Sequence, residues 1–283
     1  HMEKAGLLTE ALVYLRQAGE QAARIYANNE GVKYFSRAIN LAAEDDPQTQ
    51  YPLRLARESL YDLLGDRTAQ IRDLDDLAEM GDHLDASQQA EIAIRRANFN
   101  LVTGNFAAGL ESARQATALA EKSADSHHLA AALTLQAQAL WRLNQRPEAH
   151  ALLLRALELA DLARQDEAKA DTLRMLGNLA YDQDNYAEAR LYFEQSLEIC
   201  RQIGFRRGEC SALNSLGILV NRIHRGSEEA LARYQEALQA ASEMGDRHQE
   251  SLVLINLGIA YRSRREYDQA IQSYKNALKI QEE

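Results

Sequence analysis

The sequence is poor in the residues that interrupt helices or build sheets. Of its 283 residues only 3 are proline and 6% are aromatic, and no run of Val, Ile and Thr has the period of two that predicts a strand. Ala, Leu, Glu, Gln and Arg dominate, and these residues lose little conformational freedom in a helix. We therefore expect an all-α chain, either two domains or one quasi-linear array, because this length exceeds what one core usually covers.

Long apolar runs and cysteines are also scarce. No apolar stretch approaches the 18 or so residues that predict a membrane-spanning helix, and no signal peptide is recognisable. The 2 cysteines, Cys200 and Cys210, fit a reduced cytoplasmic protein. They lie symmetrically about residue 205, in an expected turn, so they are either buried small side chains or a redox pair.

The two ends of the chain look incomplete. Residues 1–2 resemble a cloning remnant, and residues 281–283 stop without a polar closing helix. Because helical arrays usually carry polar terminal caps, we expect this chain to be a fragment of a longer protein.

Basic charge is in short supply, with 32 Lys and Arg against 42 Asp and Glu and a formal net charge of −10. Binding to phosphates needs a basic face, so we expect no nucleic-acid partner. The acidity is strongest over residues 62–91, where nine acidic residues stand against Arg67 and Arg72. This segment is either an ordinary solvated surface or an acidic docking patch. The patch would consist of Asp73, Asp75, Asp76 and Glu79.

Residue patterns that carry chemistry are absent. The pair His127-His128 lacks further ligands at helical spacing, and adjacent helical residues face apart. No nucleophile, base and acid can be assembled, and no Gly-rich phosphate-binding loop occurs. We expect no enzyme activity, no cofactor and no metal.

What the sequence does contain is an internal repeat. The Leu-Gly dipeptide of the triplet Leu176-Gly177-Asn178 recurs as Leu216-Gly217 and Leu257-Gly258, and the successive glycines are 40 and 41 residues apart. Twelve or thirteen residues after each glycine stands an alanine, followed four residues later by an aromatic residue. Small residues at a helix crossing allow close approach, and a ring four residues on fills the space beside it. Each unit is thus predicted to be a helical hairpin.

The period continues through the rest of the chain in weaker form. Gly19, followed at the same offset by Gly31, marks a first unit, and Ala97 and Ala137 mark later ones. Residues 53–81 have helical spacing but an uncertain register. We predict a single array over residues 5–283. Its seven approximate units are 8–44, 50–81, 87–122, 127–164, 167–203, 207–244 and 247–283.

The block from Asn185 to Ile199, Asn-Tyr-Ala-Glu-Ala-Arg-Leu-Tyr-Phe-Glu-Gln-Ser-Leu-Glu-Ile, closely resembles the second helix of a tetratricopeptide repeat (TPR). The resemblance is strongest in the last four units. It implies a right-handed superhelical solenoid of about seven TPR hairpins that binds partners rather than catalysing a reaction. The 40-residue period is similar to a subclass found in polarity adaptors, kinesin light chains and bacterial signalling ATPases.

The segment from Tyr14 to Leu41 further resembles the first TPR unit behind the ATPase module of bacterial STAND-type regulators and multidomain cyclases. This resemblance implies that the chain is the regulatory arm of a larger bacterial signalling protein, with its nucleotide site elsewhere.

TPR geometry puts partner-facing residues at fixed offsets from each crossing residue, and here those positions are rich in amides and arginines. They are Asn98, Thr134, Gln138, Trp141, Arg142, Arg174, Asn178, Tyr181, Asn214, Asn221 and Arg222. Amides can pair with an extended peptide backbone and arginines with carboxylates. These residues are either a groove for an extended peptide or a partner helix, or simply polar helix faces. Trp141 is either a partner anchor or a core residue.

Three functions therefore compete. The first is a protein-interaction scaffold that binds a protein or peptide in this groove. The second is a ligand-sensing regulatory domain that binds a small molecule or a short signal peptide. The third is self-association through the uncapped ends or the groove. Arg174 and Asn178 also resemble half of a carboxylate clamp, but Ile218 stands where that clamp needs Asn, so we do not expect chaperone-tail binding.

Overall fold

A computed structural model describes residues 2–43 and 46–282, with side chains from residue 8 onward. His1 of the expected cloning remnant and the last residue of the expected open end, Glu283, lie outside the described residues. Within them the chain forms fourteen α-helices, one short 3-10 helix and no strand, so the all-α prediction is confirmed.

The elements are α1 (Met2–Arg24), α2 (Asn28–Leu41), α3 (Pro47–Leu64), α4 (Arg67–Glu79), η1 (Gly81–His83), α5 (Ala86–Val102), α6 (Phe106–Lys122), α7 (Ser126–Arg142), α8 (Arg146–Leu162), α9 (Asp166–Asp182), α10 (Tyr186–Ile203), α11 (Arg206–Ile223), α12 (Glu228–Met244), α13 (Arg247–Ser263) and α14 (Tyr267–Glu282).

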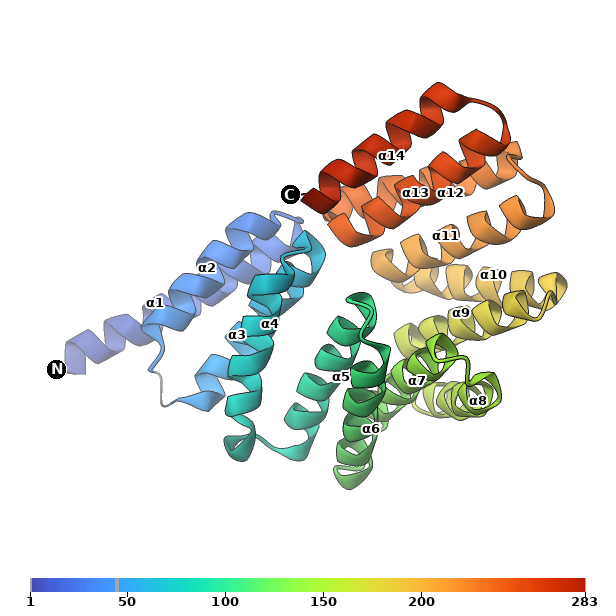
Figure 1. The fold of residues 1–283 in the computed structure, drawn as a ribbon. Helices are drawn as coiled ribbons and strands as arrows, with labels where there is room; N and C mark the ends of the chain where they lie inside the picture. The colour runs from blue at the N-terminus through green and yellow to red at the C-terminus, as the bar shows by residue number, and fades with distance from the viewer. Residues whose placement is uncertain (1, 44–45, 283) are drawn as a thin grey trace.

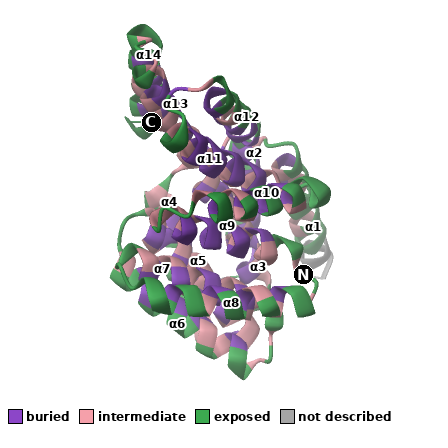
Figure 2. Cartoon of the chain, turned by 90° about the vertical axis from the view of Figure 1, so that its right-hand side faces the viewer, coloured by how far each residue is buried: buried purple, intermediate pink, exposed green. Residues whose placement is uncertain are grey.

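Consecutive helices pack in pairs, from α1 with α2 to α13 with α14 (Figure 1). From α5 to α13 the odd-numbered helices also contact one another from pair to pair, so they form one layer and the even-numbered helices form the other. Figure 2 shows buried residues on the sides of helices that face their neighbours. Each pair buries its apolar stripe only against its neighbours, as expected of a repeat array.

The predicted close crossings are present in the last three pairs. A Cβ atom added to Gly177 would lie 2.4 Å from a ring carbon of Phe193, and one added to Gly217 would lie 2.6 Å from the ring of Tyr234. Both rings are almost completely buried. The helices can approach this closely only because the crossing residue has no side chain.

The pair α3–α4, whose register was uncertain from the sequence, uses a different crossing. Glu58 and Gln70 are separated by the same 12 residues as other crossing pairs, and Gln70 Nε2 donates a hydrogen bond of 2.7 Å to Glu58 Oε1. Leu74 and Leu77 follow at the fourth and seventh positions, both fully buried. A buried polar pair therefore replaces the small residues here, which is why the period fades.

Cys200 and Cys210 are both free and buried. Burial raises the pKa of each thiol to about 12. Of the two alternatives, a redox pair or buried small side chains, the structure shows buried side chains. The Cys210 thiol donates a hydrogen bond to the carbonyl oxygen of Ala237. Separately, none of the described helices is long and apolar enough to span a membrane.

The array curls so that its last pair returns to its first two (Figure 1). α13 contacts α3, and Asn28 at the start of α2 hydrogen-bonds across to the end of α12. The described chain is therefore a superhelix closed on itself by a contact between its two ends, which we call the closing contact.

Candidate functional site

The residues predicted to face a partner all lie on the odd-numbered helices α5, α7, α9 and α11. Most are half-buried, while Arg142 and Arg222 are exposed. We call these eleven residues the polar row. Because the odd-numbered helices contact one another, side chains of this row can bridge from one pair to the next.

Two members of the polar row make hydrogen bonds within the fold. Thr134 is buried, and its hydroxyl lies 2.8 Å from that of Thr172, which ties α7 to α9. The Asn221 side chain accepts a hydrogen bond of 2.8 Å from the backbone N–H of Gly226 and so closes the turn before α12. These hydrogen bonds occupy the Thr134 hydroxyl and the Asn221 amide oxygen, and the partner-facing role of both residues stays a prediction.

Trp141 packs within the fold, as one of its two predicted roles requires, and its role as a partner anchor stays a prediction. It packs against the apolar cluster of α7 and α9, and its Nε1–H donates a hydrogen bond of 2.7 Å to Asp182 Oδ2 on α9. The exposed Arg142 guanidinium lies 4.6 Å from the ring centre of Phe106 and 5.6 Å from that of Trp141. Cation–π contact holds this arginine at the surface of the row.

The amides form the most continuous part of the row. Asn256 Nδ2 on α13 donates a hydrogen bond of 3.0 Å to Asn214 Oδ1 on α11, which extends the predicted row by one pair of helices. On α9, Asn178 contacts only the sulfur of Met175 through its Nδ2 atom. The Arg174 guanidinium lies 3.5 Å from Asp171, with its buried Nε atom unpartnered.

At the far end of the row, aromatic and cationic groups gather. Arg222 Nε donates a hydrogen bond of 3.2 Å to the hydroxyl of Tyr186, whose ring lies 5.9 Å from that of Tyr181. Burial raises the pKa of Tyr181, so its hydroxyl stays protonated and can donate a hydrogen bond. For Asn98 and Gln138 the structure shows a half-buried place on α5 and α7.

Of the acidic residues in the segment 62–91, some are exposed, including Asp75 and Glu79, and others pair with arginines of the fold. Asp73 is buried, and Arg57 Nε lies 2.8 Å from its Oδ2 atom. Asp75 pairs at 2.7 Å with Arg96 of the next helix pair. Arginines of the fold thus partner Asp73, Asp75 and Asp76, and the acidic docking patch stays a prediction.

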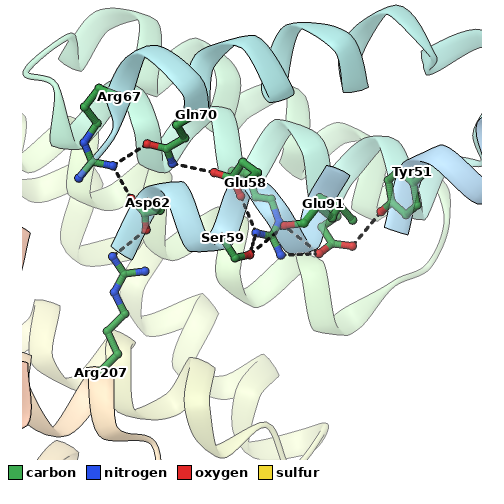
Figure 3. A network of polar contacts seen from close by, with 10 residues as sticks. Tyr51, Glu58, Ser59, Asp62, Arg67, Gln70, Glu91 and Arg207 are labelled. Carbon is green, nitrogen blue, oxygen red and sulfur yellow. Dashed lines mark hydrogen bonds and ion pairs between the residues drawn. The ribbon is translucent and has the colours of Figure 1, made fainter. Parts of the chain in front are cut away.

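The helices α3, α4 and α5 also hold a buried polar network that the sequence analysis missed (Figure 3). Tyr51 donates to Glu91 at 2.8 Å, and the Arg95 guanidinium spans from Glu91 at 3.0 Å to Glu58 at 2.7 Å. Gln70 adds its hydrogen bond to the same Glu58 carboxylate. Burial raises the pKa of Glu58, although Arg95 opposes this shift.

The network continues into the closing contact. Arg67 bridges from Gln70 to Asp62, each at 2.5 Å, and Arg207 of α11 lies 2.7 Å from the other oxygen of Asp62. Arg207 Nε also lies 3.1 Å from Asp246 Oδ2, without hydrogen-bond geometry. Burial would raise the pKa of Asp62, but Arg207 and Arg67 outweigh it and lower that pKa to about 2.

A cavity of about 1210 Å³ lies at the closing contact. Its walls come from the start of α2, the turn between α3 and α4, the start of α13 and the end of α14. The lining mixes two tyrosines, several aliphatic side chains and charged groups, among them His248. Burial lowers the pKa of His248, and the charge of Arg67 lowers it further, which favours the neutral imidazole.

Comparison with known proteins gives the repeats their family. Residues 170–203 and residues 208–283 each match a family model described as tetratricopeptide repeat. The chain carries tetratricopeptide repeats. A curated relative, tetratricopeptide repeat protein 29 of Trypanosoma brucei brucei, is 26% identical over 128 residues, which are 45% of this TPR chain. The match spans only 26% of the length of that relative.

Solved structures share the fold of this TPR chain at low sequence identity. The Rap conjugation gene regulator of plasmid pLS20, in complex with the Phr* peptide, has a TM-score of 0.77 at 11% identity and covers 100% of this chain and 76% of its own. A Rap protein complexed with competence and sporulation factor has a TM-score of 0.69 at 14% identity, covering 96% and 77%.

A third structure is the STAND signal-transduction ATPase with a tetratricopeptide repeat sensor from Pyrococcus horikoshii, with a TM-score of 0.59 at 16% identity. It covers 95% of this TPR chain and 40% of its own. At these identities the three likenesses show a common fold, which agrees with the solenoid predicted from the sequence.

Proposed function

We propose that the chain is a non-catalytic protein–protein interaction scaffold that binds an extended peptide or a partner helix along the polar row. The observation that carries this proposal is the amide series on α9, α11 and α13. Asn214 accepts a hydrogen bond from Asn256, and the NH2 group of Asn214 is left to donate. Amides placed one repeat apart can pair with successive backbone groups of an extended chain, largely whatever its sequence.

The similar folds support this proposal by analogy. Two of them were solved with a bound regulatory molecule, the Phr* peptide and competence and sporulation factor respectively. A TPR fold hosts many ligands, so the choice of partner depends on the side chains of the polar row. We further propose that the chain acts in the bacterial cytoplasm as the regulatory arm of a larger signalling protein, and an upstream nucleotide-binding module in the full-length sequence would test this.

The polar row can be tested with a double variant, Asn178→Ala with Asn214→Ala. We expect it to lose most of the partners captured by the wild-type chain, as identified by quantitative mass spectrometry. The matched control is Gln272→Ala with Asn276→Ala, which removes an exposed amide pair from α14. Equal capture by the test and control variants would remove the polar row from consideration as the binding surface.

A second function, ligand sensing, is favoured by the cavity at the closing contact. Its volume of about 1210 Å³ is large enough for a small molecule or a few residues of peptide. A ligand there would touch both ends of the superhelix. Thermal unfolding in the presence of a metabolite and peptide library is the measurement, and we expect at least one compound to raise Tm. If no compound does so while protein capture persists, the scaffold function stands alone.

A further inference from the structure

The closing contact depends on one arginine. The guanidinium of Arg207, at the start of α11, is shared between Asp62 at the end of α3 and Asp246 at the start of α13. The side chains of the two aspartates are only 5% and 0% exposed. Without Arg207, Asp246 would lose its ion pair and Asp62 would keep only Arg67, so two buried carboxylates from opposite ends of the array would face each other with less positive charge to balance them.

The closing contact also contains buried polar atoms that lack hydrogen-bond partners. Within the described residues, five buried side-chain atoms have no hydrogen-bond partner, and three of them lie here: Asn28 Oδ1, Arg67 Nη2 and Asp246 Oδ2. Such atoms lose their hydrogen bonds to water without replacement, which disfavours the closed state. In the free energy of the closed state, the favourable ion pairs and these unmet groups oppose each other.

The first three helices share an apolar cluster of their own, which includes Phe35, Leu53 and Leu60. α4 packs against α3. The seam to α5 contains only a small apolar cluster around Leu77 and Leu84 together with the polar network. α3 and α5 also approach each other less closely than the odd-numbered helices that follow. The short helix η1 lies at this seam, between α4 and α5.

We propose that α1–α4 swing as one body about η1, and that Arg207 is the latch that holds the superhelix closed. Opening separates Asp62 from Arg207 and exposes the odd-numbered helices to larger partners. That the opening controls the access of partners to the polar row rests on the proposed function of this row. The motion itself does not depend on that function. The polar network along α3 connects latch and seam through Arg67, so the two are mechanically linked.

The latch can be tested without any partner by measuring the distance between spin labels at Lys33→Cys and Ser242→Cys. Both positions are exposed, and they lie on the two sides of the closing contact. The native cysteines are buried and do not compete for label. For Arg207→Ala we expect the ratio of long to short distances to rise about tenfold or more, because buried Asp246 loses its cation and buried Asp62 keeps only Arg67.

The matched control is Arg206→Ala. This neighbouring arginine pairs with Glu209 and Glu243 of its own helix pair and does not touch the closing contact, so the distance distribution should equal that of the wild type. A folded Arg207→Ala variant with the wild-type distribution would overturn the proposal.

If Arg207→Ala fails to fold, Asp62→Asn serves as the second variant, because it removes one charge and keeps the side-chain shape. We expect the same shift to longer distances, and an unchanged distribution in this variant would equally overturn the latch. Since no partner is present, these outcomes are independent of whether the polar row binds a peptide.

Discussion

Replacing Gly177 by alanine tests the close crossing of α9 and α10. The new Cβ atom would lie 2.4 Å from Cε1 and 2.6 Å from Cδ1 of Phe193, well inside van der Waals contact. The ring is only 1% exposed, so it has no free space to move into. Overpacking of this kind costs about 1–3 kcal/mol. Alanine also favours the helix by about 1 kcal/mol over glycine. We therefore expect a net loss of up to about 2 kcal/mol in the free energy of unfolding.

A double-mutant cycle separates the two opposing effects. In a Phe193→Leu background the ring edge is gone, so Gly177→Ala should keep its helix-propensity gain and become stabilising by up to about 1 kcal/mol. The coupling between the two positions is then about 1–3 kcal/mol, the size of the relieved overlap. Urea unfolding followed by circular dichroism at 222 nm measures all four corners of the cycle.

The control for this cycle is Gly81→Ala. A Cβ atom added there meets no atom within 4 Å, so stability should stay the same or rise slightly. The close-crossing argument fails if Gly177→Ala has the same effect with and without the Phe193 ring.

The remaining predictions concern the buried polar groups. Arg95→Ala should lower the free energy of unfolding by about 3–5 kcal/mol, because it leaves a buried carboxylate without its cation. Arg96→Ala removes a more exposed ion pair and should lower the free energy of unfolding by less than about 1 kcal/mol. Urea unfolding of the two variants compares these losses. Cys200 and Cys210 should not react with a thiol reagent in the native chain and should react fully in denaturant, and rapid native labelling would contradict their burial. The pKa of Asp62 is about 2 in the folded chain, against an ordinary value of 3.8. The ionised Asp62 side chain therefore contributes fully to the free energy of unfolding above pH 4, and this contribution is lost as the pH falls towards 2. In the Asp62→Asn variant the free energy of unfolding should fall less steeply between pH 4 and pH 2 than in the wild type. A fall as steep as that of the wild type would refute the role of Asp62.

The repeat was predictable from the sequence because it depends on residues close together in the chain. A crossing residue and its aromatic partner lie 16 positions apart in the pair of Gly177 and Phe193, and one helical hairpin brings them into contact. The small crossing residues are absent from α3–α4, where the crossing pair is Glu58 and Gln70. The aromatic partner is replaced by Ala113 in α5–α6 and by Leu153 in α7–α8. A search for small residues does not find a polar pair, because its stability depends on a hydrogen bond that requires both side chains to be buried together.

The sequence predicted which residues of the odd-numbered helices form the polar row. It did not predict which of their side chains form hydrogen bonds within the fold. All its members lie on the odd-numbered helices, as the TPR offsets imply. Whether a polar side chain there meets a partner or the fold depends on its neighbour one repeat away. Thr134 is buried because Thr172 stands opposite it, whereas Asn214 meets Asn256 and keeps hydrogen-bonding capacity. This pairing depends on the offset between successive helix pairs, which sequence periodicity gives only to within a residue or two.

The closing contact was beyond the reach of sequence reasoning for a geometric reason. Asn28 and Met244 are 216 positions apart, and they meet only if the small rotations between successive helix pairs add up to a closed turn. An error of a few degrees at each step would separate them. The same sensitivity gives the contact its value as a control point. Any change at one junction, such as the polar seam at Arg95, is carried by the rigid pairs to the far end. A buried arginine held between two carboxylates is well suited to this place, because it favours one closed geometry and tolerates few others.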